Sequence, residues 1–419
     1  MKEIAVIGSG ISGLAAAYYL SRRHRVTLFE RETRLGGHTH TVTVDTAAGP
    51  LAVDTGFIVH NTRSYPNLVR LLEELGIPTV ESDMSFSVRE EHSGFEYSSR
   101  GLRGFFAQRE NLLHARQYAL LREIHRFNIA ARGLLARERP EEPDASTLDD
   151  FLGRERFSRA FTRGYLYPLA SAIWSTAMGQ IGAFPATTLF RFFENHGMLR
   201  LTRHIRWRRI PGGCGRYIEP ITVPYRERIV CGAQITGVER RERSVRVNCA
   251  GWPAADFDEV VLACHGNQAL ALLANPSDAE RSVLGAFHTT ANEAVLHTDG
   301  RLLPRTPWGR ASWNYHLDGD SAPGATLTYH MNRLQALPVA ENFCVTLNAN
   351  GSVDPTKVVG RFVYHHPLYT LEAVRAQRRW AEISGRDRIH YSGAYWLFGF
   401  HEDGLNSAMR VARALGVEC

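Results

Sequence analysis

The sequence predicts an α/β fold in which a Rossmann-like domain is interleaved with a mixed α+β domain. Residues 3–20 have the pattern of a β-strand, a glycine-rich turn and a helix. Residues 259–264 are an apolar run typical of a buried strand in a parallel sheet. Residues 393–408 repeat the order of strand, glycine-rich turn and helix. Because these stretches lie at the start, middle and end of the chain, we expect the Rossmann-like domain to be discontinuous.

Composition is that of a globular protein with more than one lobe. The chain has 419 residues, of which 44% are hydrophobic and 22% charged. The net charge is +6, but the basic residues are scattered, so no nucleic acid partner is expected. The six cysteines form no CxxC pair and have no metal-ligand spacing, which favours a reduced cytoplasm and no metal site. No stretch approaches the roughly 18 apolar residues that span a bilayer.

The first glycine turn matches GxGxxG between a strand and a helix, which is the context that this motif requires. Its first glycine permits the tight turn, the second lets the backbone approach a pyrophosphate, and the third lets the helix pack on the strand. The helix N-terminus then faces the negative charge. The motif therefore predicts a dinucleotide site with the contact residues Gly8, Gly10, Ile11, Ser12 and Gly13.

The second predicted strand ends in an acid. Residues 25–29 are followed by Glu30, at about the 20-residue distance from the first glycine where a ribose-binding acid belongs. A carboxylate there accepts hydrogen bonds from the ribose hydroxyls and repels a 2′-phosphate.

The residues after this acid distinguish FAD from NAD. Two adjacent glycines would let the chain pass against the ribityl-pyrophosphate part of a long dinucleotide, and arginine can neutralise phosphate. A bare nicotinamide site needs neither feature. We therefore predict FAD, with further contacts from Arg31, Arg34, Gly36, Gly37, His38 and Thr39.

Residues 6–37 resemble the flavoprotein amine oxidase superfamily, which includes phytoene-type desaturases and protoporphyrinogen oxidase. The fingerprint, the acid and the RxGG run match its pattern, and residues 54–57 (Asp-Thr-Gly-Phe) resemble its DxG segment. The resemblance implies a glutathione-reductase-type, amine oxidase-like FAD domain. It also implies FAD contacts at Gly56 and Phe57, and at Ile235 on the adenine half.

The middle of the chain predicts a helical lobe. Residues 65–75 and 112–137 have helical patterns, and Thr147 begins another helix. Residues 157–207 hold ten aromatic residues, which suit either an apolar pocket or ordinary core packing. The turn at residues 211–213 resembles the superfamily's PGG element, and we expect no strand directly before it.

A basic cluster containing Trp207 precedes that turn. Tryptophan among arginines can lie at a lipid head-group boundary, although a solvated loop has the same composition. The arginines of this cluster are Arg200, Arg203, Arg206, Arg208 and Arg209.

The C-terminal glycine-rich segment would place a helix N-terminus near the flavin, where it can stabilise negative charge on the reduced ring. Glu402, Asp403 and Leu405 are the expected FAD contacts there. His401 and Glu402 are the candidate acid–base residues, with His38 and His60 as weaker candidates.

Residues 312–315, 328–335, 366–367 and 393–408 resemble a bacterial subgroup of FAD-dependent oxidoreductases that are often encoded beside cyclopropane-fatty-acid synthase-like methyltransferases. This resemblance covers nearly the whole chain. We predict an FAD-binding domain formed by residues 1–75, 205–285 and 385–419. The predicted substrate-binding domain, which includes the helical lobe, is formed by residues 76–204 and 286–384.

Four functions remain open at this point. The first is dehydrogenation or desaturation of a long fatty acyl or lipid substrate by hydride transfer to flavin N5. The second is double-bond isomerisation, since the chain also resembles bacterial polyunsaturated fatty acid isomerases. An amine oxidase is third, because such relatives place a lysine near N5 and this chain has only Lys2 and Lys357. A non-catalytic FAD-binding partner of a lipid methyltransferase is fourth.

The expected partners are a small-molecule or lipid substrate and, by the resemblance, a lipid methyltransferase. A cytoplasmic location follows from the cysteines, with peripheral contact to the inner membrane as an added option.

Overall fold

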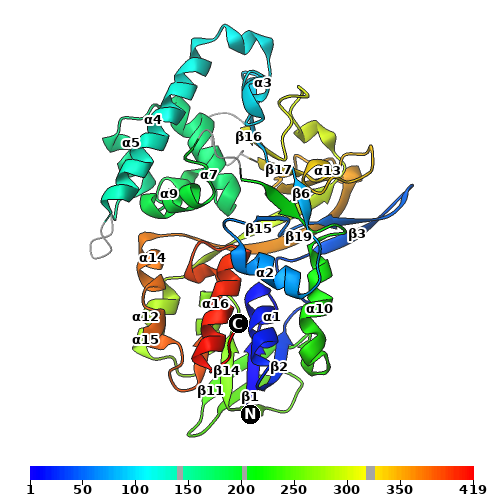
Figure 1. Cartoon of the computed structure of the whole chain (residues 1–419), viewed down its shortest axis with the longest axis vertical. Helices are drawn as coiled ribbons and strands as arrows, with labels where there is room; N and C mark the ends of the chain where they lie inside the picture. Colours follow the sequence, from blue (N-terminus) through cyan, green and yellow to red (C-terminus); the bar gives the residue numbers. More distant parts are fainter. Residues whose placement is uncertain (139–144, 201–204, 318–325) are drawn as a thin grey trace.

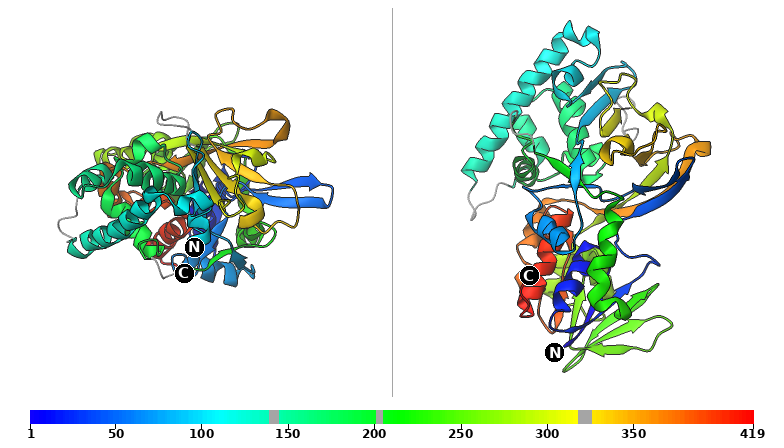
Figure 2. Two further views of the ribbon diagram at one scale, coloured as in Figure 1. Left: turned by 90° about the horizontal axis from the view of Figure 1, so that it is seen from above. Right: turned by 45° about the vertical axis from the view of Figure 1, so that its right-hand side comes forward.

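The computed structural model describes residues 1–138, 145–200, 205–317 and 326–419. The molecule is elongated, and a parallel sheet lies in the half that contains both termini (Figure 1). A larger mixed sheet and a helical lobe form the other half (Figures 1 and 2). We call these the parallel-sheet half and the mixed-sheet half.

The parallel sheet has the strand order β10-β2-β1-β14-β20, and every neighbouring pair is parallel. Residues of β1 and β14 are buried because the sheet is covered on both faces, which explains their continuous apolar sequences. The bounds are β1 (Glu3–Ile7), β2 (Arg25–Glu30), β10 (Ile229–Cys231), β14 (Glu259–Leu262) and β20 (Ile389–Tyr391).

Helix α1 (Ile11–Leu20) and the C-terminal helix α16 (His401–Ala414) lie side by side on this sheet (Figure 1). An antiparallel sheet of β11 (Ile235–Arg240), β12 (Val245–Cys249) and β13 (Ala255–Phe257) contributes to the same hydrophobic core. The parallel-sheet half is therefore layered, as expected of a Rossmann-like unit.

The mixed-sheet half is built on seven strands in the order β19-β15-β18-β17-β16-β7-β8. Only β7 and β16 pair in parallel, and the other neighbours are antiparallel. The bounds are β7 (Phe86–Glu90), β8 (Glu96–Ser98), β15 (Thr289–His297), β16 (Trp313–Leu317), β17 (Thr326–His330), β18 (Cys344–Leu347) and β19 (Val358–Pro367).

The helical lobe packs on this sheet through a second core. Thr147 caps the first turn of α5 with a capping box, as its sequence predicts. Phe127, Phe151 and Phe190 are fully buried and contact one another. The helices of this half are α3 (Gly101–Phe105), α4 (Ala115–Arg137), α5 (Leu148–Arg154), α6 (Arg159–Phe161), α7 (Tyr167–Trp174), α8 (Met178–Ile181), α9 (Ala186–Asn195) and α13 (Met331–Leu334).

Smaller elements join the halves. Hairpin strands β3 and β4 project from the side of the molecule (Figure 1), and β9 pairs with both β5 and β6. The expectation of no strand before the turn at 211–213 is wrong, because β9 ends at Arg209. The bounds are β3 (Thr41–Thr46), β4 (Gly49–Asp54), β5 (Val59–Asn61), β6 (Val80–Ser82), β9 (Trp207–Arg209), α2 (Pro66–Glu74), α10 (Ile218–Thr222), α11 (Gly266–Leu272), α12 (Asp278–Gly285), α14 (Leu371–Gln377) and α15 (Trp380–Ile383).

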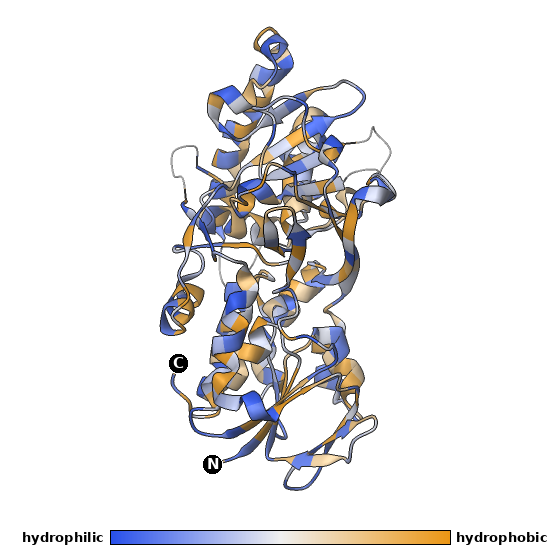
Figure 3. Ribbon diagram, turned by 90° about the vertical axis from the view of Figure 1, so that its right-hand side faces the viewer, coloured by the Kyte–Doolittle hydropathy of each residue, from blue (hydrophilic) through white to orange (hydrophobic). Residues whose placement is uncertain are grey.

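The predicted α/β fold, with parallel and mixed sheets formed by interleaved segments, is confirmed. Hydrophobic residues are concentrated where helices and strands pack together, and outer helices carry hydrophilic faces (Figure 3). The domain boundaries stay a prediction.

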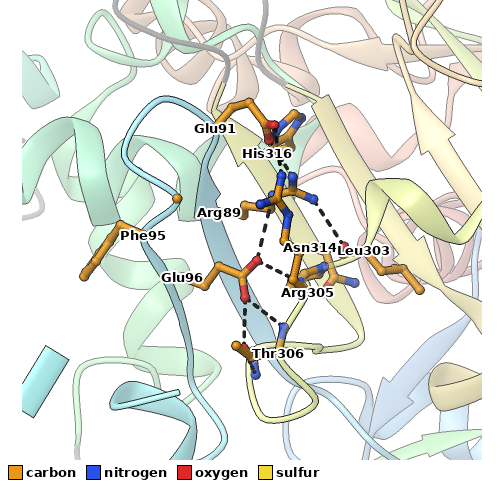
Figure 4. Close-up of polar contacts among 12 residues, drawn as sticks. Arg89, Glu91, Phe95, Glu96, Leu303, Arg305, Thr306, Asn314 and His316 are labelled. Carbon is orange, nitrogen blue, oxygen red and sulfur yellow. Dashed lines mark hydrogen bonds and ion pairs between the residues drawn. The ribbon is translucent and has the colours of Figure 1, made fainter. Parts of the chain in front are cut away.

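A buried ion-pair network fixes one edge of the mixed sheet (Figure 4). The Glu96 carboxylate on β8 accepts hydrogen bonds from the backbone N–H of Arg305 at 2.8 Å and that of Thr306 at 3.0 Å. It also accepts from the Thr306 hydroxyl at 2.9 Å. The Arg89 guanidinium lies 3.8 Å from the same carboxylate and donates to Glu91 at 2.6 Å. The loop before β16 is thus held to β7 and β8.

Glu96→Ala should lower the free energy of unfolding by about 2–4 kcal/mol, because it leaves three partly buried donors without their acceptor and removes a charge partner of the buried Arg89. Urea unfolding would measure the change. Arg246→Ala is the matched control, since its pair with Asp256 is exposed and should matter little. Equal losses in the two variants would contradict a special role for the buried network.

Candidate active site

The glycines of the turn between β1 and α1 are of two kinds: those that the turn itself needs, and one with open space beside it. Gly8 has a φ of +105°, and a Cβ on Gly13 would lie 1.8 Å from the Gly8 carbonyl oxygen. These two positions must be glycine for the chain to close its own turn. Gly10 has a φ of −62°, and no described atom lies within 4 Å of its ideal Cβ. The open space beside Gly10, where Ile11 and Ser12 begin α1, therefore fits a ligand rather than protein.

Glu30 lies at the end of β2 directly beside this turn. Its carboxylate accepts hydrogen bonds from the backbone N–H of Ser9 at 2.8 Å, the Ser9 hydroxyl at 2.6 Å and the N–H of Glu32 at 2.9 Å. The Glu30 carbonyl accepts from Ala233, two residues before Ile235. The structure thus brings the predicted ribose acid, the glycine turn and Ile235 together.

A second glycine turn packs on the first. Gly37 has a φ of +57°, and its ideal Cβ would lie 3.1 Å from the Gly10 Cα. Arg34 donates to the Gly37 carbonyl at 2.9 Å and so holds this turn. The Arg31 side chain is exposed and pairs with Glu32 at 3.3 Å.

The DxG segment lies against the second turn. A Cβ on Gly56 would lie 2.1 Å from the His38 carbonyl oxygen, and the Phe57 N–H donates to that oxygen at 2.8 Å. The Thr39 N–H closes the turn on the Gly36 carbonyl at 2.9 Å. Three separate sequence motifs therefore form one continuous surface.

The N-terminus of α16 completes this surface. Asp403 accepts a hydrogen bond from the Phe400 N–H at 2.9 Å, and burial raises the pKa of Asp403 to about 7. A Cβ on Gly404 would lie 2.7 Å from Ile11, so the N-terminal ends of α1 and α16 are in close contact. Leu405 is fully buried in the core beneath them. Two positive helix ends therefore converge where an anionic cofactor is expected.

His401 is buried at the start of α16. Its ring stacks on Phe57 with a centroid distance of 3.5 Å, and its Nε2 lies 2.9 Å from the Thr39 hydroxyl. The Thr39 hydroxyl also lies 2.6 Å from the hydroxyl of Tyr217, which the sequence did not predict as a site residue. Burial lowers the pKa of His401 to about 3, so its imidazole is neutral near pH 7.

Glu402 points away from this surface to the start of α2. One carboxylate oxygen accepts hydrogen bonds from the Asn67 N–H at 3.1 Å and its side-chain amide at 2.9 Å. The other oxygen accepts from the Leu68 N–H at 2.9 Å. A carboxylate in this position satisfies and stabilises a helix N-terminus.

His60 on β5 is completely buried, and neither ring nitrogen has a hydrogen-bond partner among the described residues. Burial lowers the pKa of His60 to about 4, and β5 begins two residues after Phe57, on which the His401 ring is stacked. A buried polar group without a partner is unusual in proteins and points to a ligand or water at that position.

Asp54 begins the DxG segment at residues 54–57, but the sequence did not predict which groups its carboxylate would bind. Its carboxylate accepts hydrogen bonds from the Thr41 hydroxyl at 2.5 Å, the Cys214 N–H at 2.9 Å and the Gln335 amide at 3.0 Å. Burial raises the pKa of Asp54 to about 6. The carboxylate thereby joins three segments that are distant in sequence, including the turn at 211–213.

An aromatic cluster connects the helical lobe with the start of α16. The Trp174 indole donates to the Phe398 carbonyl at 3.1 Å, and its ring lies 4.7 Å from Phe192. Phe192 stacks on Phe400 at 4.8 Å. Several aromatic residues of the 157–207 stretch therefore do pack as core.

A cavity of about 1860 Å³ lies between the helical lobe and the mixed sheet. Its apolar lining includes Leu152, Phe157, Leu317, Leu327 and Leu347, and its charged lining includes Glu90, Arg116, Asp149, Arg156, Arg159 and Arg163. Ser171 on α7 lines the cavity, and Trp174 on the same helix contacts the segment before α16. Helix α7 therefore links the cavity wall to the candidate cofactor surface.

The basic cluster around Trp207 is largely paired. Arg200 pairs with Glu194 at 2.5 Å, and Arg208 donates to the Thr79 hydroxyl at 2.7 Å. Arg203 lies outside the described residues. Within the described ranges, no helix combines the length and apolarity needed to cross a membrane.

Comparisons with known proteins agree with this geometry. The model of the flavin-containing amine oxidoreductase family matches residues 11–416. The chain is 39% identical over 77 residues to protoporphyrinogen oxidase 2, chloroplastic/mitochondrial, of Arabidopsis thaliana, covering 18% of this chain and 14% of that protein. It is 36% identical over 171 residues to the carotenoid phi-ring synthase of Streptomyces griseus, covering 38% and 32%. The chain thus matches about one seventh of the first relative's length and about a third of the second's.

Solved structures show the same fold over nearly the whole chain. The fatty acid isomerase of P. acnes that produces CLA has a TM-score of 0.70 at 16% identity, with 99% of both chains covered. Putrescine oxidase bound to putrescine has a TM-score of 0.71 at 16% identity, with 99% of this chain and 98% of that chain covered. The chain belongs to the flavin-containing amine oxidoreductase family.

Proposed function

We propose that the enzyme dehydrogenates or desaturates a long aliphatic substrate that carries an anionic group. The observation that carries this proposal is the cavity beneath the helical lobe. Its lining combines leucines and three aromatic rings with four arginines and two acids. Such a lining suits a fatty acyl chain with a carboxylate or phosphate head better than a small polar amine.

The FAD contacts are proposed residue by residue. Bound FAD supplies the hydride acceptor of the reaction. The pyrophosphate would lie in the open space beside Gly10, and Glu30 would hold the ribose at the end of β2. The remaining proposed contacts are Gly8, Ile11, Ser12, Gly13, Arg31, Arg34, Gly36, Gly37, His38, Thr39, Gly56, Phe57, Ile235, Asp403 and Leu405.

The two acid–base candidates at α16 take other functions in this proposal. Glu402 caps α2, because both of its oxygens accept hydrogen bonds there. His401 is a positioning residue, since its ring is stacked on Phe57 and its Nε2 lies 2.9 Å from the Thr39 hydroxyl. We propose His60 as the proton acceptor, because its ring nitrogens have no partner among the described residues.

His60→Phe should slow anaerobic bleaching of the flavin by substrate about 100-fold if this ring accepts the proton. Its melting temperature should not fall, because the ring has no protein hydrogen bond to lose within the described chain. Stopped-flow absorbance would measure the rate, with His125→Gln on the exposed face of α4 as the control. An unchanged rate would remove His60 from the mechanism.

An amine substrate is disfavoured by the position of the lysines. Lys2, just before β1, pairs with Glu259 at the start of β14 at 2.7 Å. Lys357 lies in the turn before β19. Neither lysine is part of the proposed flavin surface.

One experiment tests the proposal directly. The purified yellow protein is mixed anaerobically with membrane phospholipids, free fatty acids and amines in turn, while the flavin absorbance is followed. Bleaching by lipids or fatty acids is expected. Bleaching by amines alone would overturn the proposal, and no bleaching by any of them would favour the non-catalytic partner of a lipid methyltransferase.

A double-bond isomerase is the second candidate function, favoured by the fold shared with the P. acnes fatty acid isomerase. An isomerase returns the hydride to the same molecule. Anaerobic turnover of a fatty acid without an added electron acceptor would therefore identify an isomerase, whereas a desaturase would stop after one turnover.

Arg156→Glu should raise the KM for an anionic aliphatic substrate about 3- to 10-fold and leave kcat nearly unchanged. Arg156 is exposed at the cavity rim, so its charge acts on binding rather than on chemistry. Steady-state kinetics would measure both constants. Arg243→Glu, an exposed arginine between β11 and β12, is the control. An unchanged KM in Arg156→Glu would contradict entry through this rim.

A further inference from the structure

Helix α3 lies toward the end of the molecule farthest from both termini (Figure 1). Large apolar side chains are exposed on α3 and just before α4. Leu102 on α3 is 74% exposed, and Leu112 and Leu113 before α4 are 51% and 89% exposed. Single exposed leucines are common on protein surfaces, but a group of them marks an interaction site.

These leucines belong to one surface. The Phe106 N–H donates to the Leu102 carbonyl at 2.9 Å, and the Phe106 ring contacts that of Tyr118 at 5.6 Å. The Tyr118 hydroxyl, in turn, donates to the Leu112 carbonyl at 2.9 Å. Tyr118 is 52% exposed and Trp308 is 43% exposed. We call this surface the tip patch, which consists of Leu102, Leu112, Leu113, Tyr118 and Trp308.

Positive charge surrounds the tip patch. The guanidinium groups of Arg100 and Arg103 lie 5.2 and 5.5 Å from the centre of the Trp308 ring. Between residues 100 and 118, four arginines are accompanied by one acid, Glu110. Leucine with tryptophan, tyrosine and arginine is the composition of segments that enter the interface of an anionic membrane.

We propose that the tip patch docks on a lipid bilayer that contains anionic head groups. The leucines enter the boundary of the acyl chains, and the arginines contact the head groups. The charge of the segment favours this occupant, because it complements an anionic lipid surface. The proposal does not depend on which substrate the enzyme oxidises.

The docked orientation has a consequence for the cavity. Arg116, at the start of α4, lines the cavity rim and pairs there with Glu90 at 3.1 Å. The same helix carries Tyr118 of the tip patch, two residues later. Docking would therefore bring part of the cavity rim close to the lipid surface.

Vesicle sedimentation of the FAD-loaded enzyme tests the proposal. Vesicles of about seven parts phosphatidylcholine to three parts phosphatidylglycerol should bind the enzyme, and pure phosphatidylcholine should bind it at least 10-fold more weakly. The double variant Leu112→Ser/Leu113→Ser should lower binding about 10-fold or more, because less apolar surface enters the bilayer. Trp252→Ser is the matched control, since Trp252 is 60% exposed in the parallel-sheet half.

Unchanged flavin absorbance and melting temperature in the double variant would show that its fold is intact. The proposal is overturned if the enzyme does not bind the anionic vesicles, or if Trp252→Ser loses as much binding as the double variant. It is also overturned if the double variant keeps its vesicle binding but changes the oligomeric state, since a second copy would then cover the patch. No readout involves turnover, so failure here is distinct from failure of the proposed function.

Discussion

Gly13→Ala should abolish FAD binding and yield a colourless protein. The new Cβ would lie 1.8 Å from the Gly8 carbonyl oxygen, and that atom is backbone at the end of β1. The strand and α1 would have to separate, which would disrupt the turn that is proposed to hold the pyrophosphate. Absorbance near the flavin bands after incubation with excess FAD would measure the loss.

Gly10→Ala separates a ligand requirement from a folding requirement. Its Cβ meets no described atom within 4 Å, so the FAD-free protein should keep its melting temperature. FAD affinity should fall at least 10-fold, or about 1.4 kcal/mol, because the methyl group would occupy the space assigned to the cofactor. Gly133→Ala within α4 is the control, since its Cβ also meets nothing within 4 Å. Normal FAD affinity in Gly10→Ala would show that the cofactor lies elsewhere.

The protein should unfold cooperatively between about pH 6 and pH 5, because it buries many neutral histidines. Burial lowers the pKa of each of these histidines below its usual value, whereas an unfolded histidine takes up a proton near pH 6.5. The unfolded state therefore binds more protons as the pH falls, so stability present above about pH 6.5 is lost below it. The eight residues are His38, His60, His196, His265, His297, His330, His366 and His401.

The size of this effect is large. At pH 5 each of the seven histidines with a folded pKa of about 3 or 4 costs about 2 kcal/mol, and together they cost as much as the roughly 5–15 kcal/mol by which proteins are usually stable. Asp54 and Asp403 act in the opposite direction, because their raised pKa values let the folded state hold protons there. Two such groups offset only part of the effect of eight histidines.

Tryptophan fluorescence and circular dichroism during an acid titration would test this expectation on the FAD-loaded protein. His60→Phe should move the midpoint to lower pH, because one buried histidine is gone. His125→Gln should leave it in place, since His125 is exposed. A protein that stays folded at pH 4.5 would show that these histidines are protonated, or hydrated, in the native state.

The fold could be predicted from local sequence patterns because its decisive signals are short. The spacing of Gly8, Gly10 and Gly13 and the position of Glu30 are set within one strand–helix–strand unit. Contacts between motifs that are far apart in the sequence could be identified only from the structure. Glu402 accepts a hydrogen bond from Asn67, which is 335 residues away in the sequence. Asp54 accepts one from Cys214, which is 160 residues away. No periodicity in the sequence encodes such pairs.

The helical lobe shows the same limit in another form. The ten aromatic residues of 157–207 were compatible with either a pocket lining or a packed core. The burial of each side chain in the structure distinguishes the two. Phe161 and Phe190 are core, whereas Phe157 lines the cavity. Strand β9 was missed because it has only three residues, two of which are arginines, and so carries no recognisable strand pattern.

The position of β20 at the edge of the parallel sheet has a consequence for biosynthesis. At about 5–20 residues per second, a ribosome needs about 20–80 s after making the first glycine turn to reach this strand. During that time the nascent chain holds β1 without its later neighbours and without α16. We expect cofactor loading to follow the synthesis of α16, and chaperones to be most needed before that moment.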